Sequence, residues 1–442
     1  MSHSNSPGLE ANLSNLIGNL KPLKNFVNFS PPKIGPLEIT AVTEALSSGW
    51  LTTGPRAERF EKVMSQYLGS QGALALSSCT AALHIGLKVM GLGPGDAVIT
   101  TPLTFVSTTH AALYNSVRPF LVDVSSDTGN IDPEKITVFL EKECFKDSEG
   151  QLVHKKTQLK VKALVPVHYA GHPVDLGQLW PLCQRFNLSM LEDAAHALGS
   201  KFEGLPVGHE HLQPKASRDS QGLTSMVAFS FYATKNVATG EGGLLTCSDP
   251  ALLARARKLA AYGITDARRI WDRYAPKGTW AYDVDEVGFK ANFTDLQAAL
   301  GLAQMSQLNE FLLSRAKNVQ IWNGAFKQIE DLVELPTVRQ GAVHSWHLYP
   351  LRLRTNKLKI SRDDFIAALK ALNIGTSVMF IPIHYHSCYK DFLGYGPGAF
   401  PVAEDFFARE VSLPISPATP QDDLEEAAAL TVKLLKQNSK IA

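Results

Sequence analysis

Short apolar segments alternate with amphipathic segments through the larger, N-terminal part of the chain. The apolar segments have the length and composition of buried strands, and the amphipathic segments have the period of helices. The predicted strands are residues 73–76, 97–100, 118–124, 159–167, 188–192, 226–231 and 243–246. The predicted helices are residues 35–48, 56–68, 81–90, 105–115 and 174–186. This alternation predicts an α/β fold with a mainly parallel central sheet and helices on both faces.

The pattern changes near the end of this region. Residues 293–326 show a long helical pattern, which we expect to link the sheet to a second domain. Beyond it, residues 348–353 are predicted to be a strand, and residues 362–372 and 422–436 are predicted to be helices. The second domain is therefore expected to be a smaller, C-terminal α+β domain.

The predicted elements divide the chain into three parts. We expect a large domain over residues 36–309 and the small domain over residues 310–442. Residues 1–35 are rich in Ser, Asn, Gly and Pro and are predicted to be a loosely ordered N-terminal lead-in. The charged segment 142–160 is predicted to be a surface excursion, to which the sequence assigns no function.

Composition excludes several classes of protein. The net charge of +1 gives no electrostatic reason to expect nucleic acid or an anionic membrane as a partner. No apolar run approaches the about 20 residues that cross a membrane, and residues 1–28 lack a signal pattern. The five cysteines lack CxxC spacing, which argues against a zinc site or a disulfide framework and favours a reducing compartment. We expect a soluble, cytoplasmic protein.

One lysine, Lys235, follows a predicted strand and precedes a glycine-rich stretch at residues 239–243. Burial at the end of a strand would lower the pKa of this lysine and free its amine for Schiff-base chemistry. A surface lysine after a strand is the alternative, and Lys235 alone does not decide between the two.

Three other places along the chain suit the same chemistry. Residues 77–83 form a small, hydroxylated turn before a helix, where N–H groups can hold a phosphate, although an ordinary N-cap would look the same. Asp193 at a strand end can keep a pyridine nitrogen protonated, or it can cap a helix. Phe105 can stack on a planar ring or fill the core. Together with Lys235, these are the parts of a pyridoxal phosphate (PLP) site.

The motifs and their order resemble those of the DegT–StrS group of nucleotide-sugar aminotransferases, within the aspartate-aminotransferase-like superfamily. The resemblance runs from about residue 30 to residue 436. The motifs that carry it are GWLTTGP (49–55), SSCTAAL (77–83), GDAVITTPLTFVS (95–107), EDAAHALG (192–199), FSFYATKNVATGEGG (229–243) and GFKANFTDLQAAL (288–300). The fold that it implies is that of a fold type I PLP-dependent transferase.

The resemblance implies a role for each matching position. Lys235 would form the Schiff base with PLP and then move the proton between substrate and cofactor. Asp193 would pair with the pyridine nitrogen, His196 would contact the ring hydroxyl, and Phe105 would stack on the ring. The residues expected to hold the phosphate are Cys79, Thr80 and Ser230, with Asn292 reaching it from the neighbouring subunit. Position 79 is often glycine in the family, so Cys79 is expected to contribute only its backbone N–H.

Two histidines near the C-terminal end, His384 and His386, are spaced closely enough to suggest a metal pair. No further cluster of Cys, His or carboxylate residues lies at ligand spacing nearby, so we expect no metal site. The family commonly has an aromatic, Pro and His string here, near the mouth of the site. His384 is therefore expected to contact the substrate, together with Thr53 and Gly54, while His386 is expected to be exposed.

The activity that the resemblance implies is transfer of an amino group from glutamate to a keto sugar linked to a nucleoside diphosphate, with C4 favoured over C3. The active sites are expected at the interface of a homodimer. A sugar dehydratase of the same fold that uses pyridoxamine phosphate (PMP) is one alternative. Those enzymes usually carry histidine in place of the lysine, so Lys235 argues against it. A non-catalytic regulator that kept the fold is the other alternative.

Overall fold

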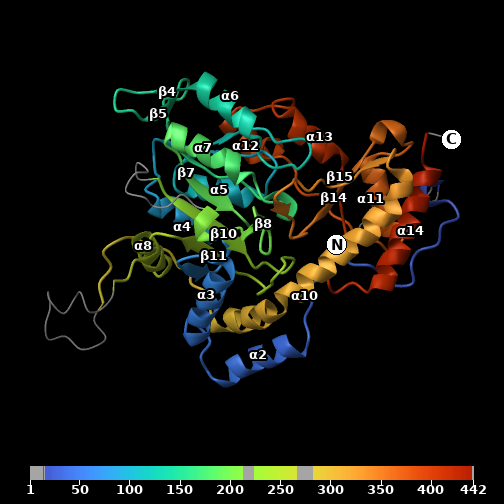
Figure 1. The fold of residues 1–442 in the computed structure, drawn as a ribbon, viewed down its shortest axis with the longest axis horizontal. Helices are drawn as coiled ribbons and strands as arrows, with labels where there is room; N and C mark the ends of the chain where they lie inside the picture. The colour runs from blue at the N-terminus through green and yellow to red at the C-terminus, as the bar shows by residue number, and fades with distance from the viewer. Residues whose placement is uncertain (1–12, 14, 213–222, 266–281, 441–442) are drawn as a thin grey trace.

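A computed structural model describes residues 13, 15–212, 223–265 and 282–440, and a nine-stranded sheet lies at the centre of these residues (Figure 1). Its main path runs β1-β11-β10-β7-β6-β2-β3. Neighbours from β10 to β3 are parallel, whereas β11 is antiparallel to both β1 and β10. The strands are β1 (Ala73–Leu76), β2 (Asp96–Thr100), β3 (Arg118–Leu121), β4 (Cys144–Lys146), β5 (Leu152–His154), β6 (Lys160–Leu164), β7 (Ser189–Asp193), β10 (Ser225–Ser230) and β11 (Gly243–Cys247). The predicted mainly parallel sheet is thus confirmed.

Helices cover both faces of this sheet. Alternate residues of a strand point to opposite sides, and here the residues on both sides are apolar. Leu74 and Leu76 of β1 pack on one side, and Ala73 and Ala75 pack on the other. The first side is covered by α4 (Cys79–Val89), α5 (Val106–Tyr114) and α8 (Pro250–Ala260). The second side is covered by α3 (Pro55–Leu68), α6 (Pro133–Glu143), α7 (Leu176–Phe186) and α10 (Asp295–Phe326).

Two of these helices, α6 and α8, were not predicted from the apolar pattern. Each begins with an Asp–Pro pair, at residues 132–133 and 249–250. Asp132 accepts a hydrogen bond from the N–H of Glu134 at 2.9 Å, and Asp249 accepts one from that of Ala251 at 2.8 Å. An N-cap aspartate followed by proline is a start signal for a helix that hydrophobic periodicity does not detect.

The segment predicted to be a surface excursion forms the hairpin β4–β5, which lies off the main path of the sheet and joins the start of β6. β5 pairs with β6 at Val153 and Lys160. Cys144 and Leu152 are buried, while Phe145 is exposed. All of β5 is buried, whereas most of β4 is exposed, so the prediction of a surface excursion is corrected for β5.

The small domain is built on a second, antiparallel sheet of β12 (Val333–Glu334), β14 (Tyr349–Leu353) and β15 (Glu410–Leu413). Its core contains Trp322 and Phe326 from the second half of α10, which runs from one domain into the other (Figure 1). Leu16 and Leu20, from the expected lead-in, also pack on this core. The helices that follow α10 are α11 (Arg362–Ala371), α12 (Ser387–Leu393), α13 (Pro401–Arg409) and α14 (Gln421–Gln437). A further helix, α2 (Pro36–Ser47), comes before the first strand of the large sheet. The domain boundaries themselves stay a prediction.

A third, small sheet connects the two domains. It consists of β8 (Lys201–Phe202), β9 (Leu205–Pro206) and β13 (Ala342–Val343). β13 pairs with β8, so the turn that follows β13 lies beside the chain that precedes β8. Among the described residues, no helix is both long enough and apolar enough for a membrane span.

Candidate active site

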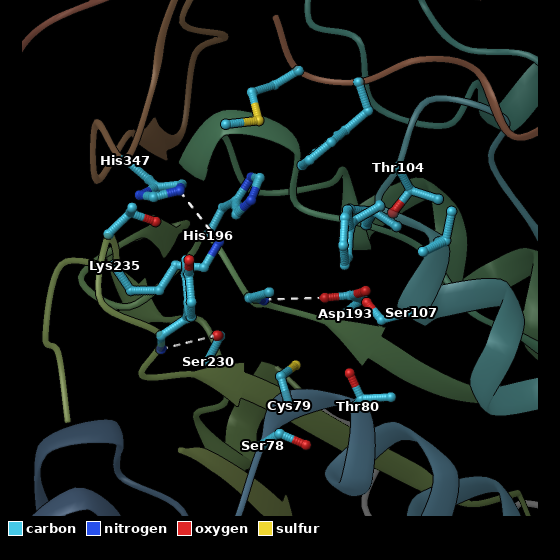
Figure 2. Close-up of a pocket in the computed structure, with 18 of the residues that line it drawn as sticks. Ser78, Cys79, Thr80, Thr104, Ser107, Asp193, His196, Ser230, Lys235 and His347 are labelled. Atoms are coloured by element: carbon cyan, nitrogen blue, oxygen red, sulfur yellow. Dashed lines mark hydrogen bonds between the residues drawn. The ribbon is translucent and has the colours of Figure 1, made fainter. Parts of the chain in front are cut away.

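The ends of two parallel strands, β7 and β10, and the start of α4 open into a cavity of about 630 Å³ (Figure 2). The carboxyl ends of parallel strands share one edge of a sheet, which is where such folds bind ligands. The predicted site residues that line the cavity are Cys79, Thr80, Phe105, Asp193, His196, Ser230 and Lys235. The structure therefore brings together every predicted cofactor residue except Asn292.

The start of α4 forms one end of the cavity. Ser78 is its N-cap, and the side-chain oxygen accepts a backbone N–H of the first turn at 3.1 Å. The N–H groups of Cys79 and Thr80 begin the helix and have no carbonyl partner within it. With Ser230 nearby, these groups and the helix dipole suit a phosphate. Gly243 of β11 allows this packing, because a Cβ there would lie 2.3 Å from the carbonyl carbon of Ser78.

The carboxylate of Asp193 lies at the other side of the cavity floor. The Thr108 hydroxyl donates to its Oδ2 at 2.7 Å, and the Ala195 N–H donates to its Oδ1 at 3.1 Å. Burial raises the pKa of Asp193, and these two hydrogen bonds and the charge of Lys235 oppose the rise. No basic side chain in the described part of the chain forms an ion pair with this buried carboxylate. It therefore suits a ligand that brings its own positive charge, such as a protonated pyridine ring.

His196 and Phe105 lie above this floor. Nδ1 of His196 accepts the Ala170 N–H at 3.2 Å, so the neutral ring carries its proton on Nε2. Burial holds the pKa of His196 well below its usual range, which keeps the ring neutral. Phe105 is 57% exposed, and its ring lies 5.8 Å from that of Phe380. An exposed aromatic face at a cavity wall suits stacking on a planar ligand.

Lys235 projects its amine into the same cavity, and its Nζ lies 3.3 Å from Nε2 of His347. Burial lowers the pKa of Lys235 to about 8, with a further lowering from Arg315, whereas Asp193 raises it. A lysine whose pKa is close to neutral pH is deprotonated often enough to act as a nucleophile and as a base. The alternative of a surface lysine does not agree with this geometry.

Thr53, Gly54 and Asn292 do not line the cavity. They form a separate group, in which Asn292 Nδ2 donates to Thr53 Oγ1 at 2.6 Å and this hydroxyl donates to the Phe293 carbonyl at 2.6 Å. The Asp295 carboxylate fixes the group by accepting two backbone N–H groups at the start of α3. All three predicted residues thus lie together, but outside the cavity.

The two C-terminal histidines lie in different surroundings. His384, which is predicted to contact the substrate, is buried, does not line the cavity, and has its Nε2 3.0 Å from the carboxylate of Glu404. His386 is half-buried and lines the cavity. The physical reason is that Glu404 of α13 holds His384 inside the small domain. Among the described residues, no group of three or more His, Cys, Asp or Glu side chains is placed to hold a metal ion.

Several residues of the cavity were not predicted. Thr104 and Thr108 form a hydrogen-bonded pair beneath Asp193, with their hydroxyls 2.7 Å apart. The motif at residues 95–107 contained the first of them, but nothing marked it as a site residue. His347 and residues 378–381 also line the cavity. They come from loops of the small domain, and no local pattern distinguishes them.

A mainly parallel α/β domain whose cavity contains a lysine, an unpaired carboxylate and a phosphate-binding helix start defines a fold type I PLP-dependent transferase. The comparison with known families is more specific. Residues 32–430 match the DegT/DnrJ/EryC1/StrS aminotransferase family, and the chain belongs to this family.

Individual relatives agree with this assignment. The chain is 38% identical over 413 residues to the spore coat polysaccharide biosynthesis protein SpsC of Bacillus subtilis, covering 93% of this chain and 98% of the relative. It is 37% identical over 407 residues to an uncharacterized protein of Methanocaldococcus jannaschii, covering 92% of this chain and 97% of that protein.

Solved structures give the same result. A putative sugar aminotransferase from Streptococcus pneumoniae in its PLP form superposes with a TM-score of 0.77 at 26% identity, covering 93% of this chain and 99% of the other. The same protein was also solved in a PMP form. Helicobacter pylori PseC, an aminotransferase involved in pseudoaminic acid biosynthesis, superposes with a TM-score of 0.78 at 26% identity, covering 94% and 100%. The predicted cofactor, PLP, and the predicted class of enzyme, a sugar aminotransferase, are confirmed.

Proposed function

We propose that this enzyme moves the amino group of glutamate to C4 of a keto sugar linked to a nucleoside diphosphate. The observation that carries the proposal is the shared cavity of Lys235, the unpaired carboxylate of Asp193 and the start of α4. The names of SpsC and PseC concern a spore coat polysaccharide and pseudoaminic acid. These names support the proposal that this enzyme helps to make amino sugars that are used in surface polysaccharides.

Each of these cavity residues has a separate role in the proposed reaction. PLP, when bound, supplies an electron sink that stabilises negative charge on the substrate carbon. Asp193 would hold the proton at the ring nitrogen of bound PLP, His196 would donate its Nε2–H to the ring hydroxyl, and Phe105 would cover the ring face. The α4 start, with Cys79 and Thr80, binds the phosphate. The N–H groups at the start of α4 and the carboxylate of Asp193 would together fix the orientation of the bound ring.

Lys235 performs the proton transfers. Its amine would hold PLP covalently in the resting enzyme and would be free to act as a base once an amino substrate has bound. The free Nζ then accepts a proton from the donor carbon and returns a proton in the second half of the reaction, because the two halves are chemically the reverse of each other. The apolar residues 378–381 limit the access of water to this Nζ from the small-domain side.

A screen of acceptors tests the proposed substrate. Purified enzyme, PLP and glutamate are incubated with 4-keto and 3-keto sugars linked to UDP, GDP or dTDP. We expect equal amounts of 2-oxoglutarate and of one amino sugar, identified by mass spectrometry and NMR. Loss of a sugar hydroxyl without amine transfer would instead indicate the dehydratase. Transamination of amino acids without any sugar product would contradict the nucleotide-sugar acceptor.

We further propose a homodimer in which Thr53, Gly54 and Asn292 of one subunit complete the cavity of the other. These residues lie outside their own cavity. Trp50, near Thr53, and Val287, near Asn292, are 53% and 85% exposed. Large exposed apolar side chains next to such a group suit a subunit interface.

Mixing two inactive variants tests the composite site. In a mixed dimer of Lys235→Ala and Asn292→Ala, one site combines a native Lys235 with a native Asn292. Random mixing should therefore restore about one quarter of the native activity if the subunits exchange freely. No recovery in a dimer shown to be mixed would mean that each site is complete within its own subunit.

A further inference from the structure

His347 is a buried histidine that contacts the amine of Lys235. It is 3% exposed, and its Nε2 lies 3.3 Å from Nζ (Figure 2). It belongs to the turn between β13 and β14, which the pairing of β13 with β8 holds against the large domain. The side chain therefore crosses from one domain to the reacting group of the other.

The ring of His347 has little else to bind. Its Nδ1 is buried and has no hydrogen-bond partner among the described residues. Burial, with the charge of Lys235 and the neighbouring His196 and Arg315, holds the pKa of His347 well below its usual range. The ring is therefore neutral. Nε2 of a neutral imidazole can accept a hydrogen bond from an ammonium group, or in the other tautomer donate one to the lone pair of a neutral amine, so it can hold Nζ in both states.

Arg315 of α10 fixes the backbone of this turn. Its guanidinium is 2% exposed and donates to the carbonyls of Trp346 and His347 at 3.2 and 3.3 Å. It forms no ion pair with a carboxylate in the described part of the chain. A buried, uncompensated cation is costly, which points to a function.

The turn itself has an unusual conformation. Trp346 has a φ of 51°, in the left-handed region that side chains rarely adopt. Its N–H donates to Nδ1 of His344 at 2.8 Å, and the two rings stack with their centroids 3.9 Å apart. Strain of this kind persists where the surrounding contacts impose it, and it is concentrated at functional sites. Here it presents His347 to Lys235.

We propose that His347 is a positioning residue for Lys235, held in place by Arg315, and that it keeps Nζ at the reacting face of the cavity between proton transfers. The inference rests on the proposed role of Lys235 as the acid–base group. A long, flexible lysine side chain without a partner would sample other rotamers, and small displacements of a reacting atom are costly to the rate.

Two substitutions at position 347 test the contact in the loaded enzyme. His347→Leu removes both ring nitrogens, whereas His347→Gln keeps a polar group near the position of Nε2. We expect kcat of His347→Leu to fall about 100-fold with KM changed less than about threefold, and His347→Gln to recover most of the loss. His154→Leu replaces a buried histidine outside the cavity and is the matched control for packing. Thermal unfolding of each variant shows whether it folds.

A second readout does not depend on amino transfer. Reductive methylation of Lys235 in the full-length, cofactor-free chain, followed by mass spectrometry over a range of pH, measures the midpoint at which the amine becomes neutral. The groups that face this amine are Cys79, Asp193, His196, Arg315 and His347. For the native chain the midpoint should lie at about pH 8.

The direction of each shift follows from the contacts. His347→Leu removes an acceptor for the ammonium group, so the midpoint should fall by about one pH unit. Arg315→Met removes a neighbouring cation, so the midpoint should rise, while Arg315→Lys keeps the charge and should change it less. An unchanged midpoint and an unchanged kcat in His347→Leu would overturn the proposal. If Lys235→Ala kept its turnover while the His347→Leu midpoint still moved, the proposed function would fail but the contact would stand.

Discussion

Two walls enclose the active-site cavity, and they are built in different ways. The strand-end wall consists of residues 78–80, 193–196 and 230–235, at the start of α4 and the ends of β7 and β10. The loop wall consists of His347, residues 378–381 and His386, all from connections of the small domain. Lys235, Asp193 and the proposed phosphate site are all on the first wall, and the second wall closes the cavity over them.

The two walls differ in what holds them. The register of the sheet fixes the strand-end wall, since Ala228 of β10 pairs directly with Asp193 of β7. The loop wall depends on the β13–β8 pairing that holds the turn of His347 and on hydrogen bonds from side chains. The Tyr169 hydroxyl donates to the Met379 carbonyl, and the Met379 N–H donates to the Glu410 carboxylate at 2.9 Å. The comparison indicates that the chemistry depends on backbone geometry, while the fit to a substrate depends on contacts that a few substitutions can change.

The largest effect is expected at the centre of the strand-end wall. Lys235→Ala should lower kcat by about 10⁴-fold or more, because it removes both the nucleophile and the proton-transfer group. Steady-state kinetics measures the loss. Lys201→Ala, at an exposed lysine of β8, is the matched control and should be active. Turnover that survives in Lys235→Ala would mean that Lys235, and with it the strand-end wall, does not carry the chemical step.

Asp193 should have the next largest effect. Asp193→Asn removes the negative charge that stabilises a protonated ring nitrogen, so kcat should fall about 10² to 10³-fold with the fold intact.

Thr108→Val removes one donor to the carboxylate, which raises the pKa of Asp193 further. This variant should lose activity preferentially on the acid side of the pH profile, and Thr108→Ser should restore it. A uniform loss of activity at every pH would contradict the claim that activity depends on the ionised state of Asp193.

Apart from His347, which contacts Lys235, the loop wall should affect binding more than the chemical step. His386→Ala should raise KM for the sugar about tenfold with a small change in kcat, because His386 lines the cavity. His384→Gln should leave KM close to the native value, because His384 contacts Glu404 instead. Kinetics with the identified sugar compares the two. The reverse pattern would favour the assignment predicted from the sequence.

The smallest effect on catalysis is expected at Glu410, which supports the loop wall. Burial raises the pKa of Glu410 from 4.5 to about 8, against hydrogen bonds from Ser412 and Met379. The native state therefore holds a proton between about pH 4.5 and 8 that the unfolded chain has released, so stability should fall as pH rises through this window. Glu410→Gln should remove this part of the pH dependence and keep kcat within about threefold, since the amide oxygen can still accept the Met379 N–H.

Denaturant unfolding at several pH values measures this dependence. The native chain and Glu410→Gln should differ most at the alkaline end, where the variant should be the more stable of the two by at most a few kcal/mol. Identical slopes for both proteins would mean that Glu410 is ionised throughout, and that the loop wall does not respond to pH through this residue.

The sequence predicted the strand-end wall because each of its parts is local. An apolar run that ends in a polar residue marks a strand end, and parallel pairing then brings such ends together. The strand at residues 73–76 was predicted with the bounds that β1 has, and Asp193 and Lys235 follow from the same rule. Three of the motifs that carry the resemblance to the family, at residues 77–83, 192–199 and 229–243, contribute to this wall.

The loop wall could not be predicted in the same way. His347 reaches Lys235 only because β13 pairs with β8, which lies far from it in the chain. His384 and His386 are two residues apart in a similar setting, and their places depend on Glu404 of α13. Contacts of this kind depend on how the small domain packs, and no local period or turn signal encodes them.

The most direct test of the central claim is the absorbance spectrum of the protein with PLP, before and after glutamate, beside the spectrum of Lys235→Ala. The account predicts a visible band in the native protein that bleaches when glutamate is added, and no such lysine-linked band in the variant. A native protein without the band, or with a band that no amino donor changes, would contradict the role assigned to Lys235.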